Sequence, residues 1–494
     1  MIPESSKPMR DTELALAPAH RLLALMNEGA ISSRELTRFY IERIKTLNPR
    51  INALAARDFE RALEQARRAD EARARGDEPG PLHGLPMTIK DALESKDLLT
   101  TSGAPEYKTH VPQNDAVSVA RLREAGAIIL AKTNTPYMSG DWQAFNAIYG
   151  TTSNPWDAAR TPGGSSGGAA AAISAGLTGA DIGSDIGGSI RLPAHFCGIF
   201  GHKPSFGLVS SRGHIPGRPG SLLQADLTVI GPLARTAKDL ELILKVLAAP
   251  MPGERAFSLR LPPARAKAPK GLRVAVWADD EFSPVDAHIS AAVMRCAGLL
   301  REAGARVDFE ARPALDFAEV FENYALLMHA QMTADFPAKI RASLARRAGK
   351  LDEDDKTHAA MQARGAALTH AQSSDLKEQR EKIKAIWARF FENHDVLLCP
   401  PANVSAFAHE HNPDFWAREI SVNGQPRPYG DLMHWASLAT GAHLPATAAP
   451  LGLAGGLPVG VQIIGPYQED LTPIAVAGMI EELNGGFTAP PDFT

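Results

Sequence analysis

The chain has few cysteines, and they fit neither a disulfide framework nor a metal site. Its 494 residues contain only Cys197, Cys296 and Cys399. An odd number of cysteines this far apart matches no zinc-binding spacing and no set of paired disulfides. We therefore expect a reducing compartment and three buried, structural thiols.

Long apolar runs and excess charge are also missing. No run of 18 apolar residues occurs, and the first eight residues lack the apolar core of a secretion signal. The net charge is −4, with 52 basic against 56 acidic residues. These features predict a soluble, cytoplasmic protein with no membrane or nucleic-acid partner.

The common phosphate-binding loops are absent as well. Neither the Gly-Lys-Ser/Thr of a P-loop nor G-x-G-x-x-G after a strand is present. Residues 164–168 do satisfy G-x-S-x-G, the nucleophile elbow of α/β-hydrolases, with Ser166 at the centre. That elbow requires a strand directly before the serine, whereas residues 154–163 contain two prolines and no β-forming run. An elbow and a purely structural role for these glycines stay open as minor alternatives.

What the sequence does contain is the alternation typical of an α/β fold. Hydrophobic residues make up 44% and charged residues 22%, as in ordinary globular proteins. Residues 15–78 are typical of helices, and Ser32 and Glu35 have capping-box spacing. From residue 82 onward, short apolar runs alternate with amphipathic helices. This pattern predicts one α/β/α domain with a large mixed, twisted sheet covered by helices.

The predicted elements follow this alternation along the chain. Strands are expected at 87–90, 127–131, 272–277, 396–401 and 457–465, and helices at 58–75, 116–125, 166–177 and 289–303. The segment 249–270 is a break, and 315–392 is mostly helical, with a charged, solvated helix face at 341–356. We expect one domain, 1–494, made of N-terminal helices (1–80), a core (81–245), a variable region (250–395) and the rest of the sheet (396–494).

Two glycine-flanked serines and one lysine indicate the chemistry. Ser165 and Ser189 are separated by 24 positions, and the glycines beside each let backbone N–H groups approach a ligand. Acyl transfer requires such an arrangement, because the nucleophile must lie beside donors for the developing oxyanion. Lys90 ends an apolar run, where burial can lower a lysine pKa toward roughly 7–8 and make the amine a base. These residues predict a serine hydrolase that acts on a C–N bond with lysine as the base.

Several short motifs together resemble the amidase signature family. They are Lys90, Gly163–Gly168, Asp185–Arg191, Ala131–Asn134, Thr152–Trp156, Cys197–Pro204 and Gly231–Arg235. The resemblance covers about residues 20–245 and returns at 396–480, whereas 250–395 does not match specifically. It implies a single α/β/α domain with a large mixed sheet and a Ser–cis-Ser–Lys triad.

The resemblance also assigns roles to single residues. Ser189 is the implied nucleophile, Lys90 the base, and Ser165, after a cis peptide bond, the proton relay between them. The implied oxyanion hole consists of the backbone N–H groups of Ile186, Gly187, Gly188 and Ser189. Ser166, Asp185 and Arg191 are implied supporting residues.

Two further residues near these motifs are expected to have no catalytic role. Ser184 stands where many family members have threonine, a change that we regard as harmless. His195 lies six positions after Ser189, but Pro193 intervenes and the family uses no histidine there. We therefore expect His195 to be structural.

One loop and one helix are candidates for the substrate cleft. In relatives, the loop after Lys-Thr-Asn lines the acyl pocket, and here it supplies Tyr137, Met138, Ser139, Gly140 and Trp142. These residues indicate an apolar cleft that accepts aromatic groups, with ordinary loop packing as the alternative. A second apolar set at helical spacing, Phe317, Val320, Phe321, Tyr324, Leu327 and Met328, is expected in the core rather than in a substrate wall.

The resemblance implies hydrolysis of small or aryl amides and extends to esters and carbamates. The sequence is more similar to stand-alone members of the aryl-acylamidase and urethanase type than to the glutamine-hydrolysing component of tRNA-dependent amidotransferases, which is the alternative. A catalytically silent binding protein is a third, disfavoured alternative, because all three triad positions are present. We expect a small-molecule amide, ester or carbamate as the partner, no cofactor and no metal, and a monomer or homodimer.

Overall fold

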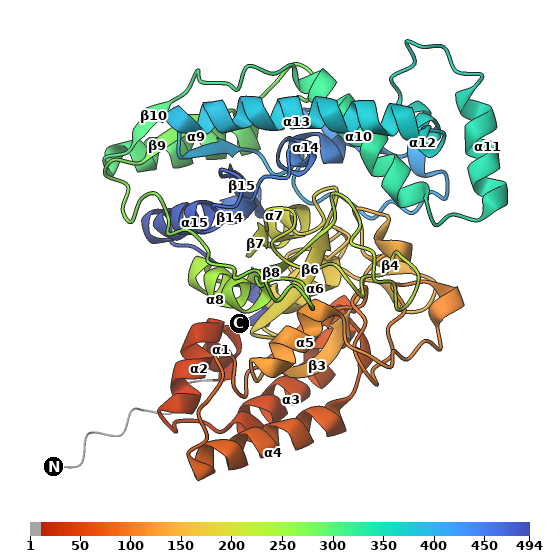
Figure 1. Ribbon diagram of the computed structural model, residues 1–494. Helices are drawn as coiled ribbons and strands as arrows, with labels where there is room; N and C mark the ends of the chain where they lie inside the picture. The colour runs from red at the N-terminus through yellow and green to blue at the C-terminus, as the bar shows by residue number, and fades with distance from the viewer. Residues whose placement is uncertain (1–10) are drawn as a thin grey trace.

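The strands form one large and one small sheet within residues 11–494, the part of the chain that the computed structural model describes (Figure 1). In chain order they are β1 (Leu54–Arg57), β2 (Pro86–Lys90), β3 (Ile128–Thr133), β4 (Phe145–Asn146), β5 (Gly150–Thr151), β6 (Ala180–Asp185), β7 (Phe200–Lys203), β8 (Val229–Ala234), β9 (Arg273–Val276), β10 (Arg306–Asp308), β11 (Val396–Cys399), β12 (Glu419–Val422), β13 (Gln425–Pro428), β14 (Ala446–Ala454) and β15 (Leu457–Ile464).

The large sheet has eight strands in the order β10-β9-β11-β15-β14-β7-β8-β6. The strands β10, β9 and β11 run parallel, and each later pair along the sheet is antiparallel. Helices cover this sheet, so the predicted α/β fold with a large mixed sheet is confirmed (Figure 1).

The small sheet, in the order β1-β3-β2, adjoins the β6 edge of the large one. The hydroxyl of Thr88 in β2 donates a hydrogen bond of 2.6 Å to Asp181 in β6. Lys90 ends β2 opposite Thr133 of β3, and every residue of β2 is buried. This junction brings the end of the lysine strand beside the strand that leads into the second serine motif.

The helices surround both sheets. In chain order they are α1 (Asp11–Leu16), α2 (Ala19–Asn27), α3 (Ser33–Ile51), α4 (Phe59–Arg75), α5 (Val117–Glu124), α6 (Gly167–Ser174), α7 (Arg191–Cys197), α8 (Ala237–Leu247), α9 (Ala287–Glu302), α10 (Phe317–Thr333), α11 (Ala338–Ala348), α12 (His358–Ala366), α13 (His370–Asn393), α14 (His434–Gly441) and α15 (Leu471–Asn484). Short 3-10 helices are η1 (Pro105–Tyr107), η2 (Tyr137–Ser139), η3 (Phe415–Ala417), η4 (Tyr429–Met433) and η5 (Pro491–Phe493). Helices α1 to α4 lie at one end of the molecule, α13 crosses the other end, and α11 lies at the edge (Figure 1).

Most predicted elements are present with shifts of a few residues at their ends. The Ser32–Glu35 capping box begins α3, because the Ser32 hydroxyl accepts from the Glu35 N–H and the Glu35 carboxylate accepts from the Ser32 N–H. The segment 249–270 has no helix or strand, as predicted. The predicted helix 166–177 ends at Ser174, shortly before Gly176 takes a positive φ of 68°.

Two expectations need correction. The N-terminal region is not wholly helical, because strand β1 lies between α3 and α4. The charged segment 341–356 is a helix only as far as Ala348, where α11 ends, and the rest is turn and irregular chain. No residue of α11 is buried, so this part is solvated as predicted.

The main hydrophobic core joins distant parts of the chain. One cluster of buried residues contains Leu36 of α3, Leu130 of β3, Val274 of β9 and Ile480 of α15, so it includes residues on both sides of the 249–270 break. This continuity supports the single-domain expectation, which stays a prediction.

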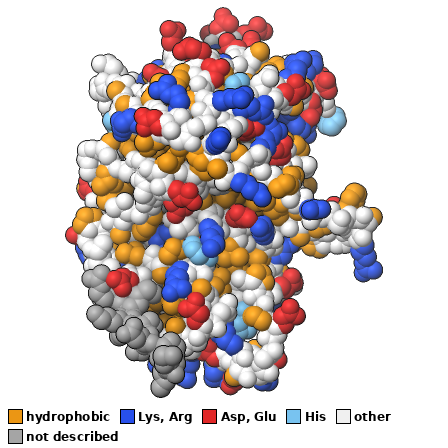
Figure 2. Space-filling model, turned by 90° about the vertical axis from the view of Figure 1, so that its left-hand side faces the viewer, with side chains coloured by type: hydrophobic (Ala, Val, Ile, Leu, Met, Phe, Trp, Pro, Cys, Tyr) orange, Lys and Arg blue, Asp and Glu red, His pale blue; other side chains and the backbone are white. Residues whose placement is uncertain are grey.

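The surface and the helices agree with the charge and hydropathy pattern. On the face seen in Figure 2, acidic and basic side chains are interspersed. Among residues 11–494, no helix is both long enough and apolar enough to cross a membrane.

Candidate active site

The side chain of Lys90 is fully buried and bonds to two serine hydroxyls. Its Nζ lies 2.6 Å from Oγ of Ser165 and 2.9 Å from Oγ of Ser184. Burial lowers the pKa of Lys90 to about 7, although the carboxylates of Asp185 and Asp181 act in the opposite direction. The amine is therefore available as an uncharged base near neutral pH.

Ser165 lies in a tight glycine turn before α6. The peptide bond between Gly164 and Ser165 is cis, as the resemblance implied. A Cβ atom on Gly164 would lie 2.5 Å from the carbonyl oxygen of Asp141, and one on Gly168 would overlap the backbone nitrogen of Asn134. These positions leave no room for a side chain, so the turn needs glycine where it packs on the neighbouring loops.

Ser189 follows β6 in a second glycine turn and faces the same cavity as Ser165. The residue is 6% exposed, and its hydroxyl makes no hydrogen bond within residues 11–494. Its carbonyl oxygen accepts a hydrogen bond of 3.1 Å from the N–H of Ser166, which ties the two serine turns together. The structure thus places Lys90 and Ser165 in contact and leaves the Ser189 hydroxyl free in the cavity wall.

Two aromatic side chains orient the peptide groups before Ser189. The Tyr324 hydroxyl donates to the carbonyl of Ile186 at 2.8 Å, and Nε1 of Trp142 donates to the carbonyl of Gly187 at 2.9 Å. In a trans peptide, the N–H of the next residue points away from the carbonyl. Fixing these two carbonyls therefore also fixes the directions of the N–H groups that follow them.

One of the four expected oxyanion donors is already occupied. The N–H of Gly188 donates to Oδ1 of Asp185 at 2.9 Å. The N–H groups of Ile186, Gly187 and Ser189 form no hydrogen bond within the described residues. This corrects the prediction for Gly188 and leaves three candidate donors, whose role stays a prediction.

Asp185 and Arg191 form a buried pair beneath this turn. The Arg191 guanidinium donates to both carboxylate oxygens, at 2.8 and 3.1 Å, and both side chains are fully buried. Burial alone would raise the pKa of Asp185, but the Arg191 charge and the N–H of Ile190 hold it at about 2. Asp185 is therefore ionised, and it binds both Arg191 and the backbone of the turn. Ser166, the third supporting residue, bonds weakly to the carbonyl of Ser184 at 3.4 Å.

Sequence reasoning missed the partners of Ser184. The Ser184 hydroxyl lies between Nζ of Lys90 and Nε2 of His214, 2.9 and 2.8 Å away. Burial and the neighbouring Lys90 charge lower the pKa of His214 to about 3, so its imidazole is neutral. The identity of Ser184 as a polar residue before the second motif was the one available signal, and nothing in the sequence points to His214.

An aromatic cavity of about 370 Å³ opens beside Ser189. All five predicted cleft residues line it: Tyr137, Met138, Ser139, Gly140 and Trp142. Sequence reasoning missed its other aromatic and thioether walls: Met328, Met332, Phe336, Phe415, Trp416 and Met433. The six apolar residues predicted for the core of α10 are all buried, but Met328 also faces this cavity, so the helix is a cavity wall as well.

The remaining histidine and cysteine predictions are confirmed. His195 is buried, and its Nε2 lies 3.2 Å from the carbonyl of Val404, with no contact to either serine. The three cysteines are buried and unpaired. Within the described residues, one group of side chains could hold a metal ion, and it does not include the serines or Lys90.

Comparisons with known proteins agree with this geometry. The sequence model described as Amidase matches residues 35–472. The glutamine-dependent relative is the A component of the glutamyl-tRNA(Gln) amidotransferase of Moorella thermoacetica, 34% identical over 490 residues, which cover 92% of this chain and 94% of that protein. The indoleacetamide hydrolase of Bradyrhizobium diazoefficiens is 32% identical over 473 residues, which cover 92% and 84%. A solved bacterial aryl acylamidase of the amidase signature family has a TM-score of 0.79 at 25% identity, over 95% of this chain and 96% of its own. The chain therefore belongs to the amidase signature family, whose enzymes act on C–N bonds in amides.

Proposed function

We propose that the protein is a free-standing hydrolase of small amides that carry an apolar, aromatic group, and that it forms an acyl-enzyme on Ser189. One observation carries this proposal: the buried Lys90 amine lies 2.6 Å from the Ser165 hydroxyl, in a cavity wall that Ser165 shares with Ser189. A buried amine bonded to a hydroxyl beside an unoccupied hydroxyl is the arrangement that base-assisted nucleophilic attack requires.

The proposed reaction moves one proton through the three residues. As Oγ of Ser189 bonds to the amide carbonyl carbon, its proton passes to Ser165 while the Ser165 proton passes to neutral Lys90. The Ser189 hydroxyl has no competing hydrogen bond within residues 11–494, so a bound substrate can direct it toward Ser165. Lys90 then returns its proton through Ser165 to the leaving nitrogen, and the C–N bond breaks. Water, deprotonated by the same route, hydrolyses the acyl-enzyme and restores Ser189.

The backbone before Ser189 supports stabilisation of the tetrahedral intermediate. The N–H groups of Ile186, Gly187 and Ser189 are the candidate donors for its oxyanion. A preorganised donor of this kind contributes about 3–4 kcal/mol of transition-state stabilisation. Tyr324 and Trp142 keep the intervening peptide groups in place through their bonds to two carbonyls.

The cavity beside Ser189 favours an aromatic substituent. Its walls include Trp142, Phe415 and Trp416, together with methionine side chains that adapt to planar rings. Two of the similar proteins, an indoleacetamide hydrolase and an aryl acylamidase, have names that indicate aromatic amides. Ester and carbamate hydrolysis belong to the same proposal, because both reactions use the same acyl chemistry.

Glutamine hydrolysis within an amidotransferase complex is the second candidate. It is favoured by the 34% identity to the amidotransferase component of Moorella thermoacetica. Glutamine carries a carboxylate and an ammonium group, which need charged partners in a buried site. No arginine or lysine among the described residues lines the aromatic cavity, and its carboxylate, Asp141, is already bonded to Arg418 and Tyr429 at 2.6 Å each. The cavity therefore supports an apolar substrate better.

A matched pair of primary amides tests the proposal. We expect phenylacetamide to exceed acetamide in kcat/KM by at least roughly 10-fold, because burial of an aromatic ring stabilises binding by about 1.5–3 kcal/mol. The panel also includes a p-nitroanilide, a p-nitrophenyl ester, an aryl carbamate and glutamine, each with wild-type protein and with Ser189→Ala. Hydrolysis of glutamine alone, or only together with partner proteins, would select the amidotransferase role instead.

A further inference from the structure

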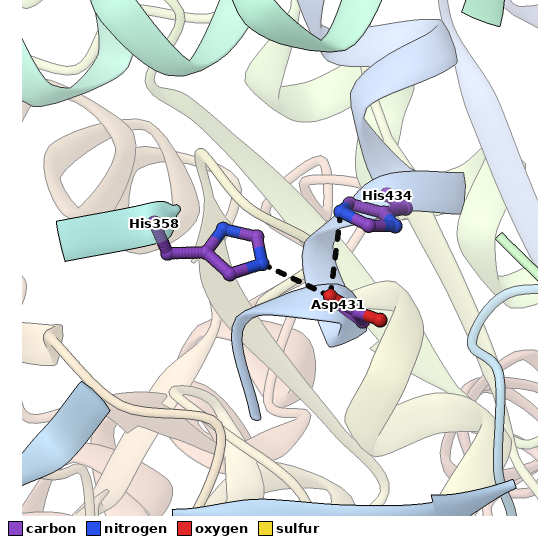
Figure 3. A group of neighbouring side chains, drawn as sticks. All are labelled: His358, Asp431 and His434. Carbon is purple, nitrogen blue, oxygen red and sulfur yellow. Dashed lines mark hydrogen bonds and ion pairs between the residues drawn. The ribbon is translucent and has the colours of Figure 1, made fainter. Parts of the chain in front are cut away.

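Two histidines and an aspartate meet at a second cavity, apart from the serines (Figure 3). His358 begins α12, Asp431 lies in η4 and His434 begins α14. Nε2 of His358 lies 3.0 Å from Oδ1 of Asp431, and Nε2 of His434 lies 3.7 Å from the same oxygen. All three side chains are buried, and their three ligand atoms lie within 4.8 Å of one another.

These distances match the spacing of ligands around one metal ion. A transition metal binds imidazole nitrogen and carboxylate oxygen at about 2.0–2.2 Å, so neighbouring ligands lie about 3.0–3.5 Å apart. The two measured separations, 3.0 and 3.7 Å, lie close to this range. A small rotation of one imidazole ring is enough to close the third edge.

A hydrogen-bond network alone does not account for the direction of both rings. His358 is within hydrogen-bonding distance of Asp431, but Nε2 of His434 is too far from it at 3.7 Å and makes no hydrogen bond within the described residues. The opposite ring nitrogen of His434 is within hydrogen-bonding distance of the Ser283 hydroxyl, at 3.2 Å. When Nδ1 donates its proton to Ser283, Nε2 turns a lone pair toward the Asp431 carboxylate, as a metal ligand requires.

The surroundings leave room and supply charge. The adjoining cavity, of about 800 Å³, gives space for water or a further ligand beside the three side chains. Arg427 already pairs with the other oxygen of Asp431 at 2.8 Å. Glu281, Glu319 and Glu322 line the same cavity and offset this positive charge. Two histidines with one carboxylate and open positions suit a divalent transition metal.

We propose that His358, Asp431 and His434 form a binding site for one divalent transition-metal ion of the zinc or cobalt type. This site is independent of the proposed amide hydrolysis, in which the ion takes no part. It adjoins the substrate cavity through Trp416, which lines both cavities and stacks on the His358 ring at 5.7 Å between ring centres. An ion bound to His358 therefore acts on a wall of the substrate cavity.

Equilibrium dialysis of chelator-treated protein against Zn²⁺ and Co²⁺ tests the proposal. We expect one ion per chain, a visible Co²⁺ absorption band, and partial quenching of tryptophan fluorescence by Co²⁺. The quenching should largely disappear in Trp416→Phe. Loss of an outer partner of a metal ligand alone weakens binding about 10–100-fold, so His358→Ala and His434→Ala should each weaken it by at least roughly 10-fold.

The controls separate this site from surface binding and from misfolding. His370, an exposed histidine that begins α13, is the matched control, and His370→Ala should bind the metal as wild type does. Asp431→Asn keeps the size of the side chain and should also weaken binding, while the circular dichroism spectrum shows whether each variant is folded. No stoichiometric binding of Zn²⁺ or Co²⁺, or unchanged binding by folded His434→Ala, would overturn the proposal.

Discussion

The amine of Lys90 lies 2.6 Å from the hydroxyl of Ser165, and no carboxylate within residues 11–494 is bonded to it. Its second partner, Ser184, is also a hydroxyl. A lysine that is buried without an anionic partner loses hydration and gains little in return, so its uncharged form is favoured. The same geometry that buries this lysine therefore makes it a base.

Removal of the proposed nucleophile or base should nearly abolish turnover. We expect Ser189→Ala and Lys90→Met each to lower kcat/KM for an aryl amide by at least roughly 10³-fold. Methionine keeps the length and apolar stem of Lys90, so the variant separates loss of the amine from loss of packing. The check is steady-state kinetics beside circular dichroism spectra. A folded Lys90→Met variant with near-wild-type rates would rule out the lysine mechanism.

The two adjacent serines should differ in their importance. Ser165 bonds to the Lys90 amine at 2.6 Å, whereas Ser166 bonds only weakly, to a carbonyl at 3.4 Å. We therefore expect Ser165→Ala to lower kcat far more than Ser166→Ala does, though less than Ser189→Ala does. The two alanine variants serve as controls for each other, since they remove the same atom one residue apart. An equal loss in both would contradict the assignment of Ser165 as the relay.

The activity should follow the titration of Lys90. With a pKa of about 7, the amine is protonated at lower pH and cannot accept a proton, so kcat/KM should fall below pH 7 and reach a plateau above it. Desolvation is the main cause of this low value. His214→Ala opens space for water beside Ser184 and Lys90, and should shift the acid limb to higher pH.

A histidine elsewhere provides the control for this pH experiment. His110 is half-buried and pairs with Glu94, away from Lys90. The profile of His110→Ala should superimpose on that of wild type. If His214→Ala lowers the rate equally at every pH without a shift of the limb, His214 has a structural role only, and the proposed link to Lys90 fails.

The catalytic motifs could be predicted from the sequence because they are local. Lys90 ends an apolar strand, and the cis bond before Ser165 lies in a glycine turn, so short patterns carry the information. Strand β6 was not predicted, since Ala180–Asp185 is made of small and polar residues without the alternation of a half-buried strand. It is buried along its whole length between β8 and the β2 edge of the small sheet.

The missed contacts depend on tertiary packing. His214 reaches Ser184 because its loop pairs with residue 93 just after β2, and no sequence pattern predicts that bridge. The occupied N–H of Gly188 follows from the position of Asp185, which only the folded turn defines. The cavity walls from α10 and η3 belong to regions outside the catalytic motifs, where no short pattern predicts which side chains face the substrate.

The hydroxyl of Tyr324 should matter for catalysis more than for binding. It donates to the carbonyl of Ile186 and so helps to orient the peptide group whose N–H belongs to Gly187. A hydrogen bond of this kind contributes about 1 kcal/mol, which corresponds to roughly a 5-fold change in rate. We expect Tyr324→Phe to lower kcat by about this factor with little change in KM. A change in KM alone would place Tyr324 in substrate binding instead.

The buried pair beneath the turn should be the most sensitive point for stability. All five N–H donors of Arg191 are bonded, to Asp185, Ala436, Thr440 and Gln462. Arg191→Met leaves the Asp185 charge buried without its partner, and we expect a loss of about 3–5 kcal/mol in the free energy of unfolding, measured by urea titration. The exposed pair of Lys245 and Glu241 is the control, since Lys245→Met should change stability by less than about 1 kcal/mol. Similar small losses in both variants would mean that Asp185 finds other partners or takes up a proton, and that Arg191 is not what keeps the turn in place.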